Sequence, residues 1–151
     1  MNTSEPYILM LEDDNDDRHI TQLFFAEKGH KINFEFLADA NEVMRWLQQR
    51  AAVDHRLPEL IILDRNIPVG NSMEALKQVK EHPVFKMIPV VMISGTPIPA
   101  DVKESYRLGA NSFIHKPFNS EDTAKTIGNF INYWLDTVIL PVNSPVATML
   151  S

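Results

Sequence analysis

The stretch Leu60-Ile61-Ile62-Leu63-Asp64 consists of four apolar residues that run directly into a carboxylate. A continuously apolar run of this length is typical of a β-strand that is covered on both faces. Tyr7 to Leu11 has the same form and runs into Glu12-Asp13, while Ser112 to Ile114 is followed, after His115, by Lys116-Pro117. Parallel strands of one sheet share a carboxyl edge, so we expect these acids and the lysine to meet there.

Two further strand candidates and five helical patterns complete an alternating order along the chain. The strand candidates span 32–37 and 88–93, and the alternation of Phe34, Phe36 and Ala38 with polar residues favours an edge position for the first. The helices are indicated by apolar residues at helical spacing: Ile20, Leu23 and Phe24; Val43, Trp46 and Leu47; Met73 and Leu76; Val102, Tyr106 and Ala110; Ile127, Phe130, Ile131, Trp134, Leu135 and Val138. The alternation predicts an α/β fold with a doubly wound, five-stranded parallel sheet.

Length and composition exclude several classes of protein. At 151 residues the chain is expected to form one domain, and the absence of cysteine excludes disulfide scaffolds, thiol catalysis and Cys-type zinc sites. A formal net charge of −6 argues against binding to nucleic acid or to an anionic membrane. No apolar stretch approaches the ~20 residues that cross a bilayer, and residues 1–6 lack the features of a secretion signal. We therefore expect a cytoplasmic protein.

The acids expected at the sheet edge predict a metal site. Like charges cost roughly 4 kcal/mol per pair at ~4 Å and an effective dielectric of ~20. A chain that gathers them is expected to hold a hard divalent cation, Mg²⁺ or alternatively Mn²⁺, through oxygen ligands. Asp13, Asp64 and the backbone carbonyl of Asn66 are the candidate ligands, and Glu12 would reach the ion through water.

Asp64 is also the candidate nucleophile, because a carboxylate can accept a phosphoryl group. Positive charge must then neutralise the transferring oxygens. Lys116 is the candidate partner of the phosphoryl group, and the hydroxyl of Ser94, after the strand candidate 88–93, would bind another of its oxygens. Taken singly, Asp64 could be a turn residue, the acidic run 12–17 a solvated helix start, and Lys116 a surface lysine. Their joint placement favours the chemical interpretation.

Four motifs in this order resemble the receiver domain of two-component response regulators, which has the CheY-like, flavodoxin-like (βα)5 fold. They are Leu11-Glu12-Asp13, Leu63-Asp64-Arg65-Asn66-Ile67-Pro68, Ile93-Ser94-Gly95 and Phe113-Ile114-His115-Lys116-Pro117-Phe118. The resemblance covers residues 6–136. It implies that Asp64 accepts a phosphoryl group from a sensor histidine kinase, so that the protein is a signalling domain rather than an enzyme.

The same resemblance assigns the other residues of the site. It implies that Glu12 and Asp13 serve magnesium and that Lys116 contacts the phosphoryl group. It further implies that Ser94 and Phe113 form a switch, in which the hydroxyl moves toward the phosphoryl group and the ring rotates inward behind it.

Three features bear on the kind of receiver. Residues 130–141 resemble single-domain regulators that are paired with bacterial phytochrome kinases. Ser72 stands where receivers usually carry glycine, and Arg65 follows Asp64 where an apolar residue is common. Both departures lie in the loop beside the acceptor, so they bear on its conformation and on the phosphoryl lifetime without removing a reacting group.

Two other functions stay open at this point. One is a degenerate receiver that binds partners without phosphorylation, against which the chemically competent residues argue. The other is a hydrolase of the haloacid dehalogenase type, whose aspartate nucleophile follows the first strand and is accompanied by an acid two residues on. Here Asp64 follows the third strand and Asn66 stands at the second position. Because few residues follow 136, we expect output through protein binding, kinase feedback or a phosphorelay.

The C-terminal region predicts an interaction surface. Residues 137–151 are interpreted as an extension of the domain. Tyr133, Ile139 and Leu140 fall outside the core stripe of the last helix, and the extension adds Val142, Met149 and Leu150. A contiguous apolar patch suggests a partner surface. We therefore hypothesise a homodimer through the fourth helix, fifth strand and last helix, the alternative being a tail that folds back over its own domain.

Overall fold

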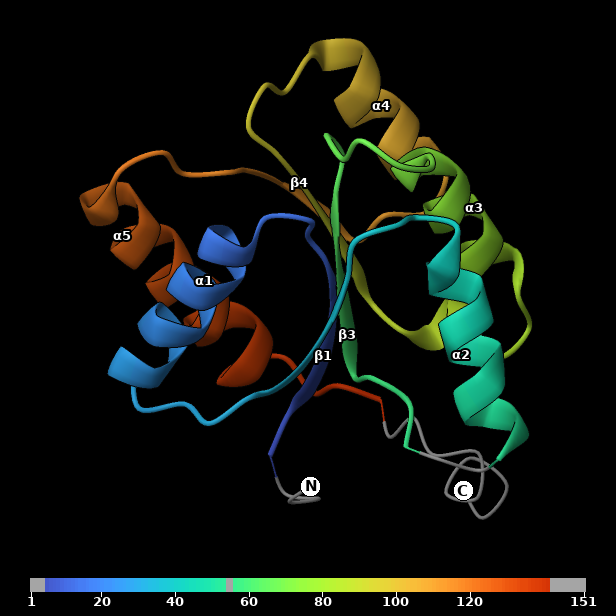
Figure 1. The fold of residues 1–151 in the computed structure, drawn as a ribbon, viewed down its shortest axis with the longest axis horizontal. Coiled ribbons are helices and arrows are strands. Elements are labelled where there is room, and N and C mark those ends of the chain that lie inside the picture. Colours follow the sequence, from blue (N-terminus) through green and yellow to red (C-terminus); the bar gives the residue numbers. More distant parts are fainter. Residues whose placement is uncertain (1–4, 54–55, 142–151) are drawn as a thin grey trace.

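A parallel sheet forms the centre of the fold (Figure 1). The computed structural model describes residues 5–53 and 56–141. The order of strands in the sheet is β2-β1-β3-β4-β5, and every neighbouring pair is parallel. The strands are β1 (Tyr7–Leu11), β2 (Asn33–Leu37), β3 (Leu60–Asp64), β4 (Val90–Ser94) and β5 (Ser112–His115). The strand order reverses around β1 and β3, and ligands of such sheets bind at the carboxyl ends of the strands at this switch point.

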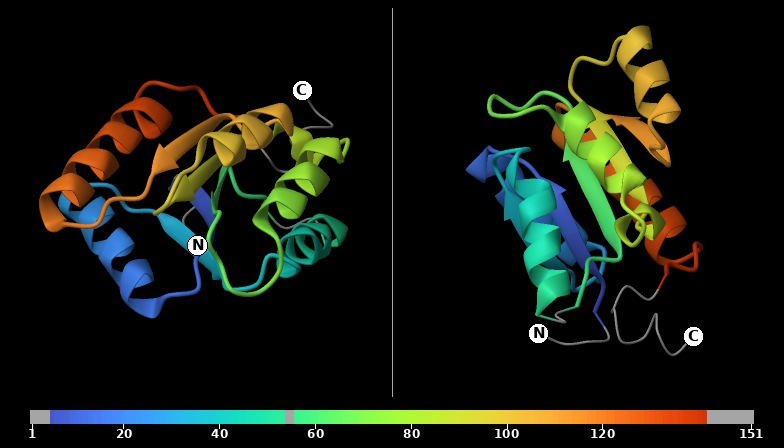
Figure 2. Two further views of the ribbon diagram at one scale, coloured as in Figure 1. Left: turned by 90° about the horizontal axis from the view of Figure 1, so that it is seen from above. Right: turned by 90° about the vertical axis from the view of Figure 1, so that its right-hand side faces the viewer.

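Helices cover both faces of the sheet (Figures 1 and 2). One face is covered by α1 (Asn15–Glu27) and α5 (Ser120–Phe130), and the other by α2 (Glu42–Ala52), α3 (Ser72–Glu81) and α4 (Pro99–Arg107). A 3₁₀ turn, η1 (Phe85–Met87), precedes β4, and a π-helical turn, η2 (Ile131–Leu135), continues α5. No helix in the described ranges is long and apolar enough to cross a membrane.

Two apolar clusters hold these layers together. Every residue of β1, β3 and β4 is buried, because helices cover both faces of these central strands. Alternate residues therefore belong to different clusters. On the side of α2 and α3 the cluster includes Leu9, Leu63 and Leu76, whereas on the side of α1 and α5 it includes Met10, Phe25 and Phe130.

Local signals at the helix starts fix where each helix begins. The Asp14 side chain caps α1 by accepting a hydrogen bond from the Asp17 amide at 2.9 Å. Asn71 and Asn119 cap α3 and α5 in the same way, and Pro99 opens α4, where a missing N–H costs nothing. These caps hold the loops that carry the site next to the sheet.

The α/β fold with a doubly wound five-stranded sheet is confirmed, with β2 at one edge as expected. Strand limits differ by at most two residues from the predicted ones. The last helix differs more, because regular α-helix ends at Phe130 and i→i+5 hydrogen bonds follow, from Asp136 to Ile131 and from Val138 to Tyr133. This turn directs Leu140 back onto the core, so the expectation of an outward-facing Leu140 was wrong. Residues 142–151, including Val142, Met149 and Leu150, lie outside the described ranges.

Candidate functional site

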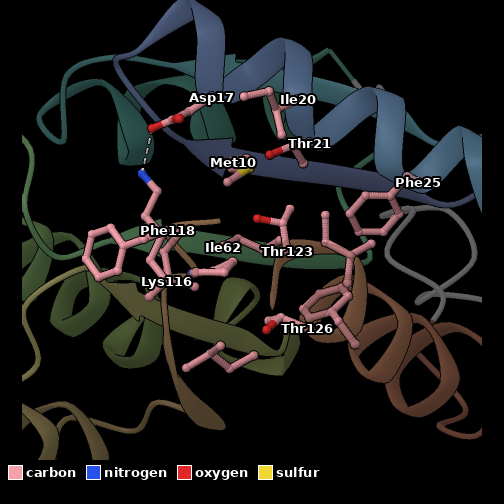
Figure 3. A pocket seen from close by; sticks show the side chains of 15 residues that line it. Met10, Asp17, Ile20, Thr21, Phe25, Ile62, Lys116, Phe118, Thr123 and Thr126 are labelled. Carbon is pink, nitrogen blue, oxygen red and sulfur yellow. Dashed lines mark ion pairs between the residues drawn. The ribbon is translucent and has the colours of Figure 1, made fainter. Parts of the chain in front are cut away.

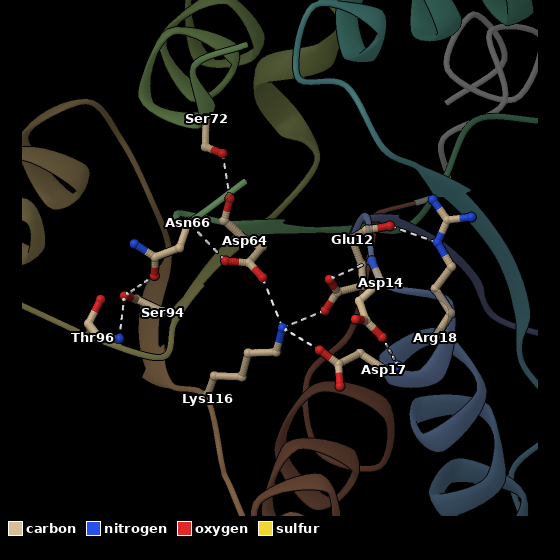
Figure 4. A network of polar contacts seen from close by, with 10 residues as sticks. All are labelled: Glu12, Asp14, Asp17, Arg18, Asp64, Asn66, Ser72, Ser94, Thr96 and Lys116. Atoms are coloured by element: carbon tan, nitrogen blue, oxygen red, sulfur yellow. Dashed lines mark hydrogen bonds and ion pairs between the residues drawn. The ribbon is translucent and has the colours of Figure 1, made fainter. Parts of the chain in front are cut away.

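Lys116 lies just beyond β5, at the centre of an ion-pair network on the carboxyl edge of the sheet (Figure 4). Its Nζ is 2.5 Å from Glu12 Oε1, 2.9 Å from Asp64 Oδ2 and 3.1 Å from Asp17 Oδ2. These acids come from the end of β1, the end of β3 and the first turn of α1. The Lys116 amide donates to the Ser94 carbonyl at 2.8 Å, which fixes the backbone from which the lysine extends.

Asp64 is held firmly from several directions. Its side chain is buried, and its Oδ1 accepts a hydrogen bond from the backbone N–H of Asn66 at 2.8 Å. The Ser72 hydroxyl donates to the Asp64 carbonyl, so the serine directly contacts the backbone of Asp64. The next amide, of Arg65, donates to the Ile93 carbonyl of β4 at 2.8 Å. The Asp64 carboxylate is therefore presented with little conformational freedom.

Ser94 at the end of β4 is linked to the same loop. Its hydroxyl donates to Asn66 Oδ1 at 2.7 Å and accepts from the Thr96 amide at 3.1 Å (Figure 4). Since the Asn66 backbone N–H also donates to Asp64, one residue connects Ser94 to Asp64. Any movement of the Ser94 hydroxyl toward Asp64 has to break its bond to Asn66.

Burial and pairing set the charge state of the site. Burial raises the pKa of Glu12 above its usual value, while hydrogen bonds from Lys116 and from the Asp14 amide oppose the rise. Burial also disfavours the ammonium of Lys116, but hydrogen bonds and charges from Glu12 and Asp64 outweigh burial and raise the Lys116 pKa above its usual value. Lys116 therefore remains a cation throughout the neutral range.

The donor set of this edge fits a hydrated divalent cation. Three carboxylates contact one ammonium, which leaves two negative charges in excess, and Asp13 and Asp14 line the same cavity. Within residues 5–53 and 56–141, no three or more acidic or histidine side chains are arranged as a ready metal cage. Mg²⁺ does not need one, because it usually binds one or two carboxylates and keeps several waters.

The structure brings most of the predicted residues together. Lys116 directly contacts both Glu12 and Asp64, and the exposed Asp13 lines the cavity beside them. Asn66 lies beside them. Its backbone N–H donates to Asp64 and its side-chain oxygen accepts from Ser94, whereas the predicted metal ligand is its backbone carbonyl. Phe113 lies on β5, next to the strand that ends in Ser94. Its side chain is partly buried against the cluster on the side of α2 and α3, and its backbone N–H donates to Tyr106 Oη at 3.2 Å.

The sequence did not predict the ion pair between Asp17 and Lys116. Asp17 was interpreted as a solvated residue in the first turn of a helix, which it also is. Its ion pair with Lys116 depends on how closely α1 approaches the end of β5. The only signal in the sequence is its place three residues after the capping Asp14.

This sheet topology, with an acid-lined edge around a lysine, is the arrangement of a receiver. Residues 8–128 match the family model of the response regulator receiver domain, and the chain belongs to that family. It is therefore a receiver of two-component signalling, with the fold of the CheY-like proteins.

Particular relatives are regulators of similar size. The chain is 33% identical over 135 residues to response regulator Rcp1 of Synechocystis sp., covering 89% of this chain and 92% of Rcp1. The Mn²⁺-bound form of Rcp1 superposes with a TM-score of 0.81 at 32% identity, over 90% of this chain and 99% of that one. The phosphorylated cyanobacterial phytochrome response regulator RcpA gives a TM-score of 0.82 at 30% identity, over 91% and 99%. The chain thus resembles response regulators, one of which is a phytochrome response regulator.

Proposed function

We propose that this receiver accepts a phosphoryl group on Asp64 from a sensor histidine kinase. A carboxylate oxygen of Asp64 attacks phosphorus, the N–P bond of the kinase phosphohistidine breaks, and the imidazole leaves with the bonding electron pair. The observation that carries the proposal is the 2.9 Å contact between Lys116 Nζ and Asp64 Oδ2. This contact supports the proposal because it holds a cation beside the carboxylate, where negative charge on the transferring oxygens would have to be stabilised.

The proposed cofactor is Mg²⁺, with Mn²⁺ as an alternative. Asp13 and Asp64 would bind it, Glu12 would act through water, and the Asn66 carbonyl remains a candidate ligand. The ion supplies positive charge to the phosphoryl oxygens during transfer. The Mn²⁺-bound form of the relative Rcp1 supports a divalent ion at such a site.

Ser94 and Phe113 are the proposed switch residues. In this structure the Ser94 hydroxyl is bound to Asn66, and a phosphoryl group on Asp64 would compete for it. Phe113 is only partly buried, so inward movement of its ring would bury it further. Phosphorylation would shift the equilibrium between the two arrangements by its differential affinity for them.

The test is incubation with Mg²⁺ and acetyl phosphate, followed by intact mass measurement. We expect one added phosphoryl group in the wild type and none in Asp64→Asn, with Asp16→Asn as a control that keeps the acceptor. No added mass in either protein would support the phosphorylation-independent module instead. Rapid multiple turnover of small phosphate esters would support a hydrolase, which a signalling receiver is not expected to show.

The proposed kinase partner is a bacterial phytochrome. The similarity to the cyanobacterial phytochrome response regulator RcpA supports this choice. Phosphotransfer from a purified phytochrome kinase should be faster than transfer from an unrelated histidine kinase under the same conditions. Equal or slower transfer from the phytochrome kinase would contradict the assignment.

We also propose that the protein forms a homodimer through the fourth helix, fifth strand and last helix. Tyr133 and Ile139 are 57% and 96% exposed, which leaves them available for a partner copy. Leu140 contributes less than expected because it packs on its own core. In sedimentation experiments, Tyr133→Ala with Ile139→Ser should shift the protein toward monomer, and Val53→Ser, at a distant exposed site, should not. An unchanged dimer in the double variant would rule out this interface.

A further inference from the structure

A second cavity, of about 160 Å³, lies between α1, α5 and the sheet (Figure 3). Its lining is mostly apolar: Met10, Ile62 and Ile93 come from the sheet, Phe25 from α1 and Phe130 from α5. Its size is close to that of an apolar protein cavity of ~150 Å³ that stays dry and binds benzene. The space therefore has room for one small aromatic molecule.

The cavity exists because the helices close over only part of this face. Near the amino ends of the strands, Ile8, Leu60 and Val91 are 1%, 0% and 0% exposed. Toward the carboxyl ends on the same face, the exposed fractions rise to 5%, 5% and 9% at Met10, Ile62 and Ile93. On the opposite face, the central strands β1, β3 and β4 are 0% exposed at the corresponding positions up to their carboxyl ends, at Leu9, Leu11, Ile61, Leu63, Val90 and Met92. Packing is thus incomplete specifically beside the carboxyl edge between α1 and α5.

Three threonines supply hydrogen-bonding groups to this otherwise apolar space. Thr21 comes from α1, and Thr123 and Thr126 come from α5 (Figure 3). The Thr123 hydroxyl donates to the Asn119 carbonyl at 2.7 Å and keeps its lone pairs for a donor. In the described ranges, no protein group hydrogen-bonds the hydroxyls of Thr21 and Thr126. A ligand with one hydroxyl or N–H group would find a partner here.

The mouth of the cavity argues against a charged ligand. Asp17 and Lys116 both line it, and they are already paired at 3.1 Å. A charged group inside would lose its hydration without gaining a free counter-charge. Ile20 and Phe118, 41% and 77% exposed, also border the space.

We propose that this cavity binds a small neutral aromatic molecule with one hydrogen-bond donor, of the size and chemistry of phenol or indole. A peptide or helix is too large for a space of about 160 Å³. The site is separate from the phosphoacceptor and does not require phosphorylation. Lys116, Pro117 and Phe118 line both cavities, so a bound molecule would contact the residues that surround Asp64.

The test is an NMR titration of the full chain with indole and with phenol. We expect saturable shifts of the Ile62, Ile93 and Ile127 methyl groups and of the Lys116 amide, with a dissociation constant on the order of 1 mM. Thr126→Leu fills the cavity and should weaken binding by about tenfold or more. Thr137→Leu, the same change at an exposed position, should leave the affinity unchanged.

Two further measurements keep the test decisive. Thr21→Leu fills the space from the opposite helix, so one filled variant remains if the other fails to fold. Absence of saturation, or wild-type affinity in the folded filled variants, would overturn the proposal. Shifts of the same resonances with protein concentration alone would assign the space to a second copy of the chain and would also overturn it.

Discussion

Lys116 is the residue with the most ion pairs in the described structure, and two of its partners, Glu12 and Asp64, are almost fully buried. Lys116→Met would leave both carboxylates without their cation. Removing one partner of a buried pair typically costs about 3–5 kcal/mol. We therefore expect the free energy of unfolding of the variant, in metal-free buffer at neutral pH, to fall by an amount near the lower end of this range. Urea denaturation of the wild type and the variant measures this change in the free energy of unfolding.

The control for this change is Lys125→Met, at an exposed position on α5. It should change the free energy of unfolding by no more than about 0.5 kcal/mol. Equal stability of the Lys116 and Lys125 variants would show that water, rather than Lys116, compensates the buried acids.

Lys80 is a second partly buried lysine, and it predicts a pH dependence. Its Nζ donates to the carbonyls of Lys86 and Ile88 at 3.1 and 2.8 Å, and burial lowers its pKa to about 8. The folded state therefore binds this proton less tightly than the unfolded chain, in which Lys80 has its ordinary pKa of 10.5. Stability should rise as the pH increases from about 8 toward 10.5.

The measurement is the difference in unfolding free energy between wild type and Lys80→Met at neutral and at alkaline pH. From neutral to alkaline pH, we expect the wild type to gain about 1 kcal/mol of unfolding free energy relative to Lys80→Met. This figure allows for partial solvent screening. Lys77→Met, at an exposed position on the same helix, should show no such change. A difference that is independent of pH would mean that Lys80 titrates alike in both states.

At the level of elements, an ion pair joins the loop after β3 to α4. Arg65 Nε is 3.3 Å from Asp101 Oδ2, in the first turn of α4. Arg65 directly follows Asp64, the proposed phosphoacceptor, so this charged residue connects the loop after β3 to a helix that the proposed dimer uses. Both side chains are partly buried, which makes the pair more effective than a fully exposed one.

A double-mutant cycle with Arg65→Met and Asp101→Asn tests this link by urea denaturation. We expect a coupling energy of about 1 kcal/mol, at the upper end for pairs near a surface. The matched control is Arg107 and Glu104, a more exposed pair on α4 itself, which should give a smaller coupling energy because water screens it more. A smaller coupling for Arg65 and Asp101 than for the control would contradict the structural role.

For the molecule as a whole, binding of Mg²⁺ at the acidic edge should stabilise the fold. An ion that binds only the folded state raises the free energy of unfolding by about 2.7 kcal/mol at 100 times its dissociation constant. Asp13→Asn should remove most of this gain, whereas Asp16→Asn, outside the cavity lining, should retain it. Thermal or urea unfolding with and without Mg²⁺ gives the result, and equal gains in both variants would exclude Asp13 as a ligand.

The sequence by itself determined the elements and the residues at their ends. Buried strands such as β1 and β3 require continuous apolar runs, and helix caps such as Asn71 and Asn119 act within a few residues. These are short-range signals, so they can be found in a linear pattern. Parallel order then places the acids and Lys116 at one edge.

Only the tertiary structure decided which of these groups touch and where packing is incomplete. The contacts of Asp17 with Lys116 and of Asn66 with Ser94 depend on the approach of elements that are distant in sequence. The π-helical turn after Phe130 and the cavity between α1 and α5 likewise depend on how whole helices settle on the sheet. Such distances result from all the packing forces together, and no local pattern of residues encodes them.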